Sequence, residues 1–251
     1  RMGYPAAVGL PELREAVGNW VGRRFGVTID PDTQVIPTLG SKEATFSFAP
    51  VVLDLAGGRD TVVVTEPGYP VPERGALFAG ARVVPLPLRE ENGFLPDLGA
   101  VGDDVWGRTA LLWLNLPNNP TGAIATLDYF AEAASLARRH GFVLASDEAY
   151  TELWFDEPPC SALQLDDLTG VVAFNTLSKR SSMTGFRSGF VAGDPELVAA
   201  LKQFRPNVGT APQEFVQRAS VVAWDDEEHV ERARLSYRSK RELFLALFAR
   251  A

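Results

Sequence analysis

Short apolar runs, mostly rich in β-branched residues, alternate along this chain with longer segments in which apolar residues recur at helical spacing. Several of the short runs are apolar on both faces, which is typical of buried strands of a parallel sheet. We therefore predict strands at Thr33–Ile36, Thr61–Thr65, Arg82–Leu86, Ala110–Leu114, Phe142–Ser146, Val171–Asn175 and Gly189–Ala192.

The longer segments between these strands predict helices. Thr126 is suited to begin one of them as an N-cap, and Gly141 is suited to end it. The predicted helices are Leu10–Arg24, Ser41–Leu55, Pro72–Phe78, Leu127–His140, Glu196–Phe204, Pro212–Trp224 and Asp226–Arg250. Because parallel neighbours need connections long enough to hold a helix, the alternation predicts a three-layer α/β/α fold around a mostly parallel sheet.

The pattern becomes entirely helical after Pro195, and this change predicts how the chain is organised. We expect residues 1–225 to form one large domain and residues 226–251 to form a long helix that leaves it. The sequence begins with Arg1 and stops inside a helical pattern that includes Leu243 and Leu247. We therefore expect both ends to be cut, so that the N-terminal part of the large domain is incomplete.

Composition excludes several classes of protein. The formal net charge of -8 and the dispersed Lys and Arg residues argue against nucleic-acid binding. No apolar run approaches the length of a membrane span, so we expect no membrane insertion. Cys160 is the single cysteine, which rules out an internal disulfide and suits a reducing, cytoplasmic compartment. We assign no metal-binding residues and expect small-molecule substrates.

Polar residues gather directly after several of the predicted strands, where ligands of open α/β sheets usually bind. These segments are Gly40–Lys42, Pro67–Pro70, Asn118–Gly122, Ser146–Tyr150 and Thr176–Lys179. They are the first candidates for a functional site.

Lys179 is the most informative of these residues. It follows an apolar strand and precedes the hydroxyl-rich segment 181–184, where a desolvated amine could act as a nucleophile. An ordinary surface lysine is the alternative, and position alone favours it. Arg187 follows eight residues later, between Gly185 and Gly189. Glycines let the backbone approach a ligand, and a guanidinium can bind phosphate through two hydrogen bonds, so Arg187 supports a ligand site.

The other candidates each allow two interpretations. Asp147 ends an uncharged run and needs a partner, which is either a helix or loop donor or the protonated nitrogen of a cofactor ring. Ser41 is either a helix N-cap or part of an anion site. Tyr69 either packs in the interior or stacks on a cofactor, and the segment 119–122 alone indicates a turn.

Taken together, the chain resembles the class I/II aminotransferases, which are fold-type I pyridoxal 5'-phosphate enzymes. The resemblance covers essentially the whole chain. It rests on the order and spacing of Asn119-Pro120-Thr121-Gly122, Asp147-Glu148-Ala149-Tyr150, and Ser178-Lys179 followed by Arg187.

The resemblance implies roles for individual residues. Lys179 would bind the cofactor covalently as a Schiff base and then carry protons during the reaction. Asp147 would pair with the ring nitrogen, Tyr69 would stack on the ring, and Asn119 and Tyr150 would hydrogen-bond its phenolic oxygen. The phosphate would be held by Ser41, the backbone of Lys42, Thr176 or Ser178, and Arg187.

The resemblance also implies a homodimer with shared active sites. Tyr4 lies in a segment similar to the one whose tyrosine reaches the phosphate of the neighbouring subunit. The family's arginine for the substrate α-carboxylate belongs to a small C-terminal domain that this chain lacks. We therefore expect the chain to bind cofactor better than it transaminates, and it is potentially inactive alone.

The segments Thr38–Ala44 and Ala223–Val230 are most similar to N-succinyldiaminopimelate aminotransferases of lysine biosynthesis. This predicts transfer of an amino group, with glutamate as donor, to N-succinyl-2-amino-6-ketopimelate. The acidic residues at 225–228 also fit a helix N-terminus without any substrate. Arg205 either binds a distal substrate carboxylate or is a surface arginine.

Other functions share much of this pattern. LL-diaminopimelate, aspartate and alanine aminotransferases, and a pyridoxal-dependent β-lyase or decarboxylase, would use nearly the same cofactor residues. An aminotransferase-like regulatory module fused to a DNA-binding segment is disfavoured by the acidic composition. An interaction protein without chemistry is disfavoured because Lys179 and Asp147 are both present.

Overall fold

The computed structural model describes residues 3–249 and contains a seven-stranded sheet in the order β1-β7-β6-β5-β4-β2-β3. The strands are β1 Val35–Thr38, β2 Thr61–Glu66, β3 Arg82–Pro87, β4 Thr109–Asn115, β5 Val143–Asp147, β6 Val171–Thr176 and β7 Gly189–Gly193. Strand β7 runs antiparallel to both of its neighbours, β1 and β6. The other pairs are parallel, so the predicted mostly parallel sheet is confirmed.

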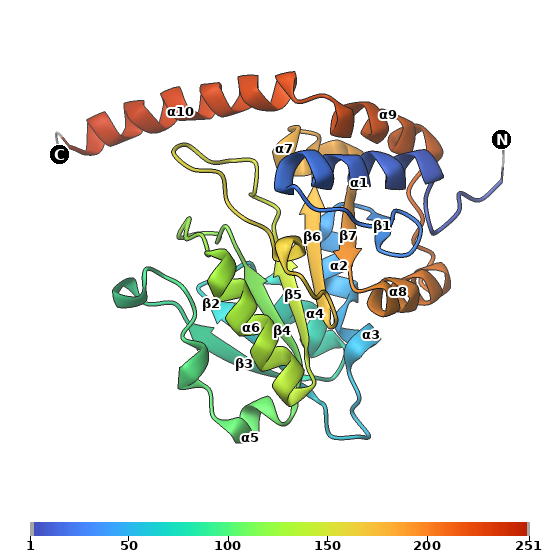
Figure 1. The fold of residues 1–251 in the computed structure, drawn as a ribbon, viewed down its shortest axis with the longest axis vertical. Coiled ribbons are helices and arrows are strands. Elements are labelled where there is room, and N and C mark those ends of the chain that lie inside the picture. The colour runs from blue at the N-terminus through green and yellow to red at the C-terminus, as the bar shows by residue number, and fades with distance from the viewer. Residues whose placement is uncertain (1–2, 250–251) are drawn as a thin grey trace.

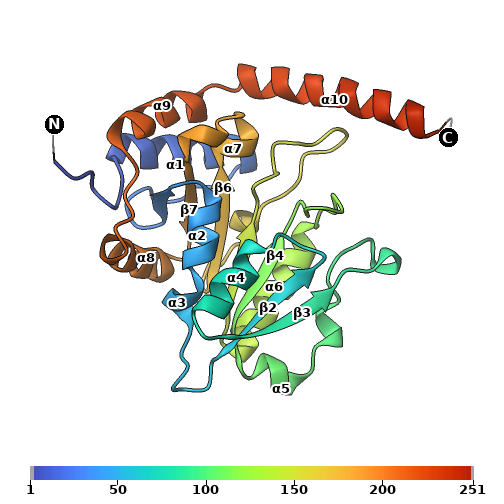
Figure 2. The same cartoon turned by 180° about the vertical axis from the view of Figure 1, so that it is seen from behind.

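Helices cover both faces of this sheet. Their bounds are α1 Pro11–Phe25, α2 Ser41–Ser47, α3 Ala49–Val52, α4 Val71–Phe78, α5 Asp103–Trp106, α6 Leu127–His140, α7 Leu177–Arg180, α8 Pro195–Asn207, α9 Glu214–Asp225 and α10 Glu228–Phe248. Figure 1 looks onto the face that α1 and α6 cover, and Figure 2 onto the face that α2 and α4 cover. The fold is therefore the three-layer α/β/α arrangement that the sequence predicted.

Strand β4 shows why the run Ala110–Leu114 is apolar at every position. Leu112 and Leu114 pack with α6, whereas Leu111 and Trp113 face the cluster that includes α2, α3, α4 and α8. All four side chains are buried, because successive residues of a strand point to opposite faces of the sheet. A third cluster joins α1 and α9 to the β1, β6 and β7 end of the sheet.

The predicted ends of α6 are confirmed. The Thr126 hydroxyl oxygen accepts the N–H of Tyr129, and Gly141 adopts the left-handed conformation with φ 69°. An N-cap satisfies a backbone donor that the first helical turn leaves free, and glycine adopts positive φ without steric cost. These two residues fix the length of the crossover between β4 and β5.

Several predicted elements differ from the structure by one to three residues at an end, and two of them have a clear physical cause. The first strand is Val35–Thr38, two residues later than predicted, because Asp30 and its neighbours form a hydrogen-bonded turn before it. The predicted helix Ser41–Leu55 is two short helices that separate at Phe48 and end at Val52. Pro50 lies in the first turn of α3, where its missing N–H is tolerated but a continuous helix would have lost a hydrogen bond.

Helix α10 runs across the top of Figure 1, and its Arg234 forms an ion pair with the buried Glu152 at 3.1 Å. Its start is fixed by Arg180 of α7, which donates to the carbonyl of Ala223 at 2.5 Å and forms an ion pair with Glu227 at 2.8 Å. Val230 is the only buried residue of α10 in the described part of the chain. The division near residue 225 stays a prediction. No helix within residues 3–249 is long and apolar enough to cross a membrane.

Candidate active site

The direction of β7 brings Arg187 to the edge of the sheet where the parallel strands end. Strands β2, β4, β5 and β6 place their carboxyl ends at this edge, whereas the antiparallel β7 begins there. Gly189 is paired with Thr38 on one side and with Thr176 on the other. The two residues before β7 therefore join the residues that follow the other strands.

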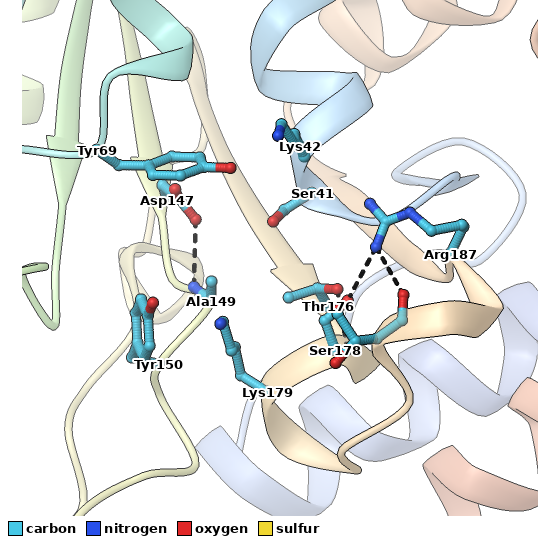
Figure 3. A pocket seen from close by; sticks show the side chains of 11 residues that line it. Ser41, Lys42, Tyr69, Asp147, Ala149, Tyr150, Thr176, Ser178, Lys179 and Arg187 are labelled. Carbon is cyan, nitrogen blue, oxygen red and sulfur yellow. Dashed lines mark hydrogen bonds between the residues drawn. The ribbon is translucent and has the colours of Figure 1, made fainter.

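One cavity at this edge collects most of the residues that the sequence singled out (Figure 3). Its lining is Ser41, Lys42, Tyr69, Asp147, Ala149, Tyr150, Thr176, Ser178, Lys179, Thr184 and Arg187. The predicted candidates thus converge from segments far apart in the sequence, as expected for a binding site at the end of an open α/β sheet.

The Lys179 side chain points into the open centre of the cavity, with Tyr150 on one side and Ser178 on the other (Figure 3). Its Nζ lies 5.3 Å from the centroid of the Tyr150 ring. Within residues 3–249 the amine has no hydrogen bond or ion pair. The segment that carries it is fixed, because the Thr176 hydroxyl oxygen accepts the N–H of Ser178 and its hydroxyl donates to the Ser188 carbonyl. The amine is therefore free to react while its backbone is held.

Asp147 is a buried carboxylate with an incomplete set of partners. It is 2% exposed, and its Oδ1 accepts the N–H of Ala149 at 3.3 Å. Burial raises the pKa of Asp147 to about 6. No arginine, lysine or histidine among the described residues forms an ion pair with it. A buried carboxylate without a cation is costly, so this site favours a ligand that brings a positively charged donor.

Tyr69 lies close to this carboxylate. Figure 3 shows its ring beside Asp147 at the edge of the cavity. Burial, and secondly the negative charge of Asp147, raise the pKa of the Tyr69 hydroxyl. Its phenol therefore stays protonated at neutral pH, and its ring offers a flat apolar surface at the cavity.

Arg187 forms the opposite, cationic end of the cavity. Its backbone has a φ of 55°, and its guanidinium donates to the Thr184 carbonyl at 2.9 Å, to the Leu39 carbonyl at 3.1 Å and to Ser178 Oγ at 3.4 Å. A Cβ atom at Gly40 would lie 2.7 Å from Arg187 Nη2, so only glycine leaves room there.

Hydroxyl and backbone donors accompany this guanidinium. Ser41 begins α2 directly after Gly40, and the first N–H groups of a helix have no partner within the helix. The hydroxyls of Ser41, Thr176 and Ser178 also line the cavity. A guanidinium, hydroxyl groups and free N–H groups together suit a phosphate group.

Two predicted site residues do not line this cavity. Asn119 is half-buried, and its backbone N–H donates to Asn115 Oδ1 at 2.9 Å. Tyr4 is fully exposed and contributes nothing to the cavity. Ala149 and Thr184 line the cavity but were not among the predicted site residues. The hydroxyl-rich run after Lys179 was a signal for Thr184, whereas nothing in the sequence marks the backbone donor of Ala149.

Both interpretations of Arg205 are wrong. Its side chain is fully buried and is absent from the cavity lining. It donates to the Pro37 carbonyl at 2.6 Å and forms an ion pair with Glu43 at 3.1 Å. Val198, Leu201 and Arg205 are the buried residues of α8, because their spacing places them on one face of the helix.

The acidic segment between α9 and α10 behaves as a helix start. Asp226 Oδ1 accepts the N–H of Glu228 at 2.8 Å, and Oδ2 lies 2.9 Å from His229 Nδ1. These local contacts account for Asp226 without a substrate. Within residues 3–249, including this acidic segment, no group of three or more His, Cys, Asp or Glu side chains is arranged to hold a metal ion.

Residues 1–251 match the family model of aminotransferases class I and II. The chain belongs to this family. Among the solved structures that are similar to the chain, an aminotransferase from Neisseria meningitidis has a TM-score of 0.92 at 40% identity, and the match covers 96% of this chain and 63% of that one. A probable N-succinyldiaminopimelate aminotransferase from Thermus thermophilus has a TM-score of 0.85 at 34% identity and covers 92% and 61%.

Curated relatives of this aminotransferase chain include LL-diaminopimelate aminotransferases. The one from Aquifex aeolicus is 41% identical over 96% of this chain and 62% of its own length. The one from Dehalococcoides mccartyi is 40% identical over 90% and 58%. The chain therefore spans about three fifths of the length of these relatives.

The cofactor of class I/II aminotransferases is pyridoxal 5'-phosphate. The cavity fits this molecule by its own chemistry. Lys179 offers a free amine for the aldehyde, and Asp147 is a buried carboxylate that needs a cationic donor. At the other end, Arg187 and the hydroxyls of Ser41 and Ser178 suit the phosphate.

Proposed function

We propose that the complete protein is a pyridoxal 5'-phosphate-dependent aminotransferase that exchanges an amino group between glutamate and a keto acid. One observation carries the proposal. A free amine at Lys179 and a buried carboxylate without a cation at Asp147 share one cavity with the cationic end at Arg187. These are the three chemical groups that the aldehyde, the ring nitrogen and the phosphate of this cofactor require.

Each of these residues has a defined task in the proposal. Arg187, Ser41, Thr176 or Ser178 and the backbone of Lys42 hold the phosphate, and Tyr69 stacks on the ring. Asp147, with its pKa of about 6, is mostly ionised at neutral pH and keeps the ring nitrogen protonated. The bound cofactor supplies an electron-accepting ring that stabilises negative charge at the substrate α-carbon.

Lys179 carries out the proton transfer in this proposal. Its amine lies beside Tyr150 with no competing acceptor among the described residues, so it can take a proton from the substrate α-carbon and return it. Tyr150 and Asn119 hydrogen-bond the phenolic oxygen of the ring. Asn119 would have to turn its side chain toward the cavity for this role.

Assembly as a homodimer is part of the proposal. Tyr4 is fully exposed on its own chain, which suits a residue that reaches the phosphate site of a second subunit. We also propose a cytoplasmic location, which agrees with the free thiol of Cys160.

For the substrate, two related amino acids are favoured. The curated relatives at 37% to 41% identity are LL-diaminopimelate aminotransferases, which favours LL-diaminopimelate. The N-succinyl derivative, predicted from the sequence, is supported by the Thermus thermophilus structure. Both place the reaction in lysine biosynthesis, and they differ in the charge at the distal amino group.

An activity assay of the complete protein tests this proposal directly. With cofactor and 2-oxoglutarate, we expect glutamate to form when LL-diaminopimelate is supplied, and at a lower rate with its N-succinyl derivative. The Lys179→Ala variant serves as the control and should form none. Release of ammonia and pyruvate from a cysteine conjugate, without glutamate formation from either amino acid, would instead establish a β-lyase.

A further inference from the structure

An ion pair with a fully buried arginine lies behind the cationic end of the cavity. Arg205 of α8 is 0% exposed, and its Nη2 lies 3.1 Å from Glu43 Oε2 of α2. Arg205 Nη1 also donates to the carbonyl of Pro37 in β1 at 2.6 Å and to that of Ala7 at 3.2 Å. The pair thus joins α8, α2, β1 and the segment that follows Tyr4.

Placing this pair in the interior costs free energy of folding. Arg205 is taken out of water entirely and Glu43 keeps only 18% of its side chain exposed, while Glu43 Oε1 and Arg205 Nε have no hydrogen-bond partner within the described residues. An apolar pair of similar volume is often as stable as a buried ion pair. The presence of these two charged groups at this place therefore points to a role other than stability.

The pair is connected to Arg187 through a single residue. Glu43 Oε2 accepts the N–H of Leu39 at 3.1 Å, and the carbonyl of the same Leu39 accepts from Arg187 Nη2 at 3.1 Å. Gly40 follows at once and lies against the Arg187 guanidinium. The side chain of Glu43 therefore fixes the loop that holds Arg187 in the cavity.

Arg205 controls both sides of this loop. Through Pro37 it holds the strand that leads into the loop, and through Glu43 it holds the helix that leaves it. A planar guanidinium presents five N–H donors in a fixed fork that reaches both sides at the same time, a geometry that the compact ammonium of lysine does not reproduce. Arg187 also donates to the Thr184 carbonyl and to Ser178 Oγ, so its guanidinium stays at the cavity without the loop. The contact with Leu39 sets the final orientation of this guanidinium.

We propose that Glu43 and Arg205 are positioning residues for the phosphate group of the cofactor, acting through Leu39 on Arg187. This inference rests on the proposed function, because it concerns binding of the same cofactor. It predicts a specific defect. When the pair is lost, the site should discriminate less between a phosphorylated ring and the same ring without phosphate.

The test compares pyridoxamine 5'-phosphate with pyridoxamine by calorimetric titration of this chain. The two ligands differ only in the phosphate, and neither carries an aldehyde, so no covalent bond to Lys179 contributes. Residues behind a metal ligand typically contribute about 10- to 100-fold to affinity. Since Arg187 keeps two other anchors, we expect the Glu43→Met/Arg205→Met double variant to lose about tenfold of the preference for the phosphorylated ligand.

Three further variants separate positioning from general damage. Glu43→Gln keeps an acceptor oxygen for Leu39 and should retain most of the preference. Arg205→Lys keeps the charge but not the two-sided contact, and should give a smaller loss; it tests the inference if the double variant does not fold. Arg24→Met removes an arginine that pairs with buried Glu152 at 2.7 Å, away from the cavity, and should leave the preference unchanged.

The outcomes are distinct. A reduced phosphate preference in the double variant, with unchanged affinity for pyridoxamine, supports the inference. An unchanged preference in the folded double variant, or in Arg205→Lys if only that variant folds, overturns it while leaving the proposed function intact. No preference for the phosphorylated ligand in the parent chain contradicts the proposed function, and the inference with it.

Discussion

Replacing Asp147 by asparagine should stabilise the ligand-free chain at pH 8 and weaken cofactor binding at the same time. Burial raises the pKa of this carboxyl from 3.8 to about 6. The folded chain therefore holds this proton more tightly than the unfolded chain. The contribution of Asp147 to stability is fully present below pH 3.8 and is lost as pH rises through 6. Asparagine has a similar shape and no charge, so it avoids this loss.

The size of the effect follows from the shift in pKa. A shift of about two units corresponds to roughly 3 kcal/mol of unfolding free energy, and about half of this falls between pH 5 and pH 8. Relative to the parent, the Asp147→Asn variant should therefore become about 1.5 kcal/mol more stable across that interval. Cofactor affinity should fall, because a neutral amide cannot keep the ring nitrogen protonated.

Urea unfolding of the ligand-free chain at several pH values measures this difference. Glu148→Gln is the matched control, since burial also raises the pKa of the neighbouring Glu148, to about 7, and its Oε1 is bonded to Ser146 and Ala162. The control should show a pH dependence displaced to higher pH, with cofactor affinity retained. A stability difference between Asp147→Asn and the parent that does not change with pH would refute the reasoning.

Two substitutions at the cationic end extend these predictions. Gly40→Ala places a Cβ atom 2.7 Å from Arg187 Nη2 at a backbone φ of 76°, so thermal unfolding should show that the variant is less stable by about 1 to 3 kcal/mol. Titration should show that it binds pyridoxamine 5'-phosphate more weakly. Unchanged affinity for this ligand would contradict the assigned contact. Arg187→Lys keeps the charge but loses the bidentate contact with phosphate, so affinity for pyridoxamine 5'-phosphate should fall about tenfold while affinity for pyridoxamine stays the same. Equal losses of affinity for both ligands would show that Arg187 does not bind phosphate.

The sequence predicted the layers of the fold because strands buried on both faces leave uninterrupted apolar runs. Leu111 to Leu114 illustrate this, since each faces a helical layer. Strand direction was not predictable in the same way, because an apolar run has the same composition in either direction. The antiparallel β7 is nevertheless the reason that Arg187, which precedes its strand, joins residues that follow theirs.

The helix over residues 41–55 was wrong although Pro50 was a visible signal, since proline in a first turn is also compatible with a helix. For Arg205, the spacing from Val198 and Leu201 placed it on the buried face of α8. Charged residues are rarely buried without a partner, and the partner, Glu43, is remote in sequence. The contacts of Asn119 and Tyr4 with the cofactor stay predictions, because neither lines the cavity of this chain.

The most direct test of the account is the site of covalent attachment of pyridoxal 5'-phosphate. The chain is incubated with the cofactor, reduced with borohydride and digested, and the modified residue is located by mass spectrometry. We predict stoichiometric attachment of a phosphopyridoxyl group to Lys179 in the parent chain. In the Lys179→Ala variant, we predict no stoichiometric modification of any residue. Stoichiometric modification of another lysine, or equal modification of the folded variant, would contradict the central claim.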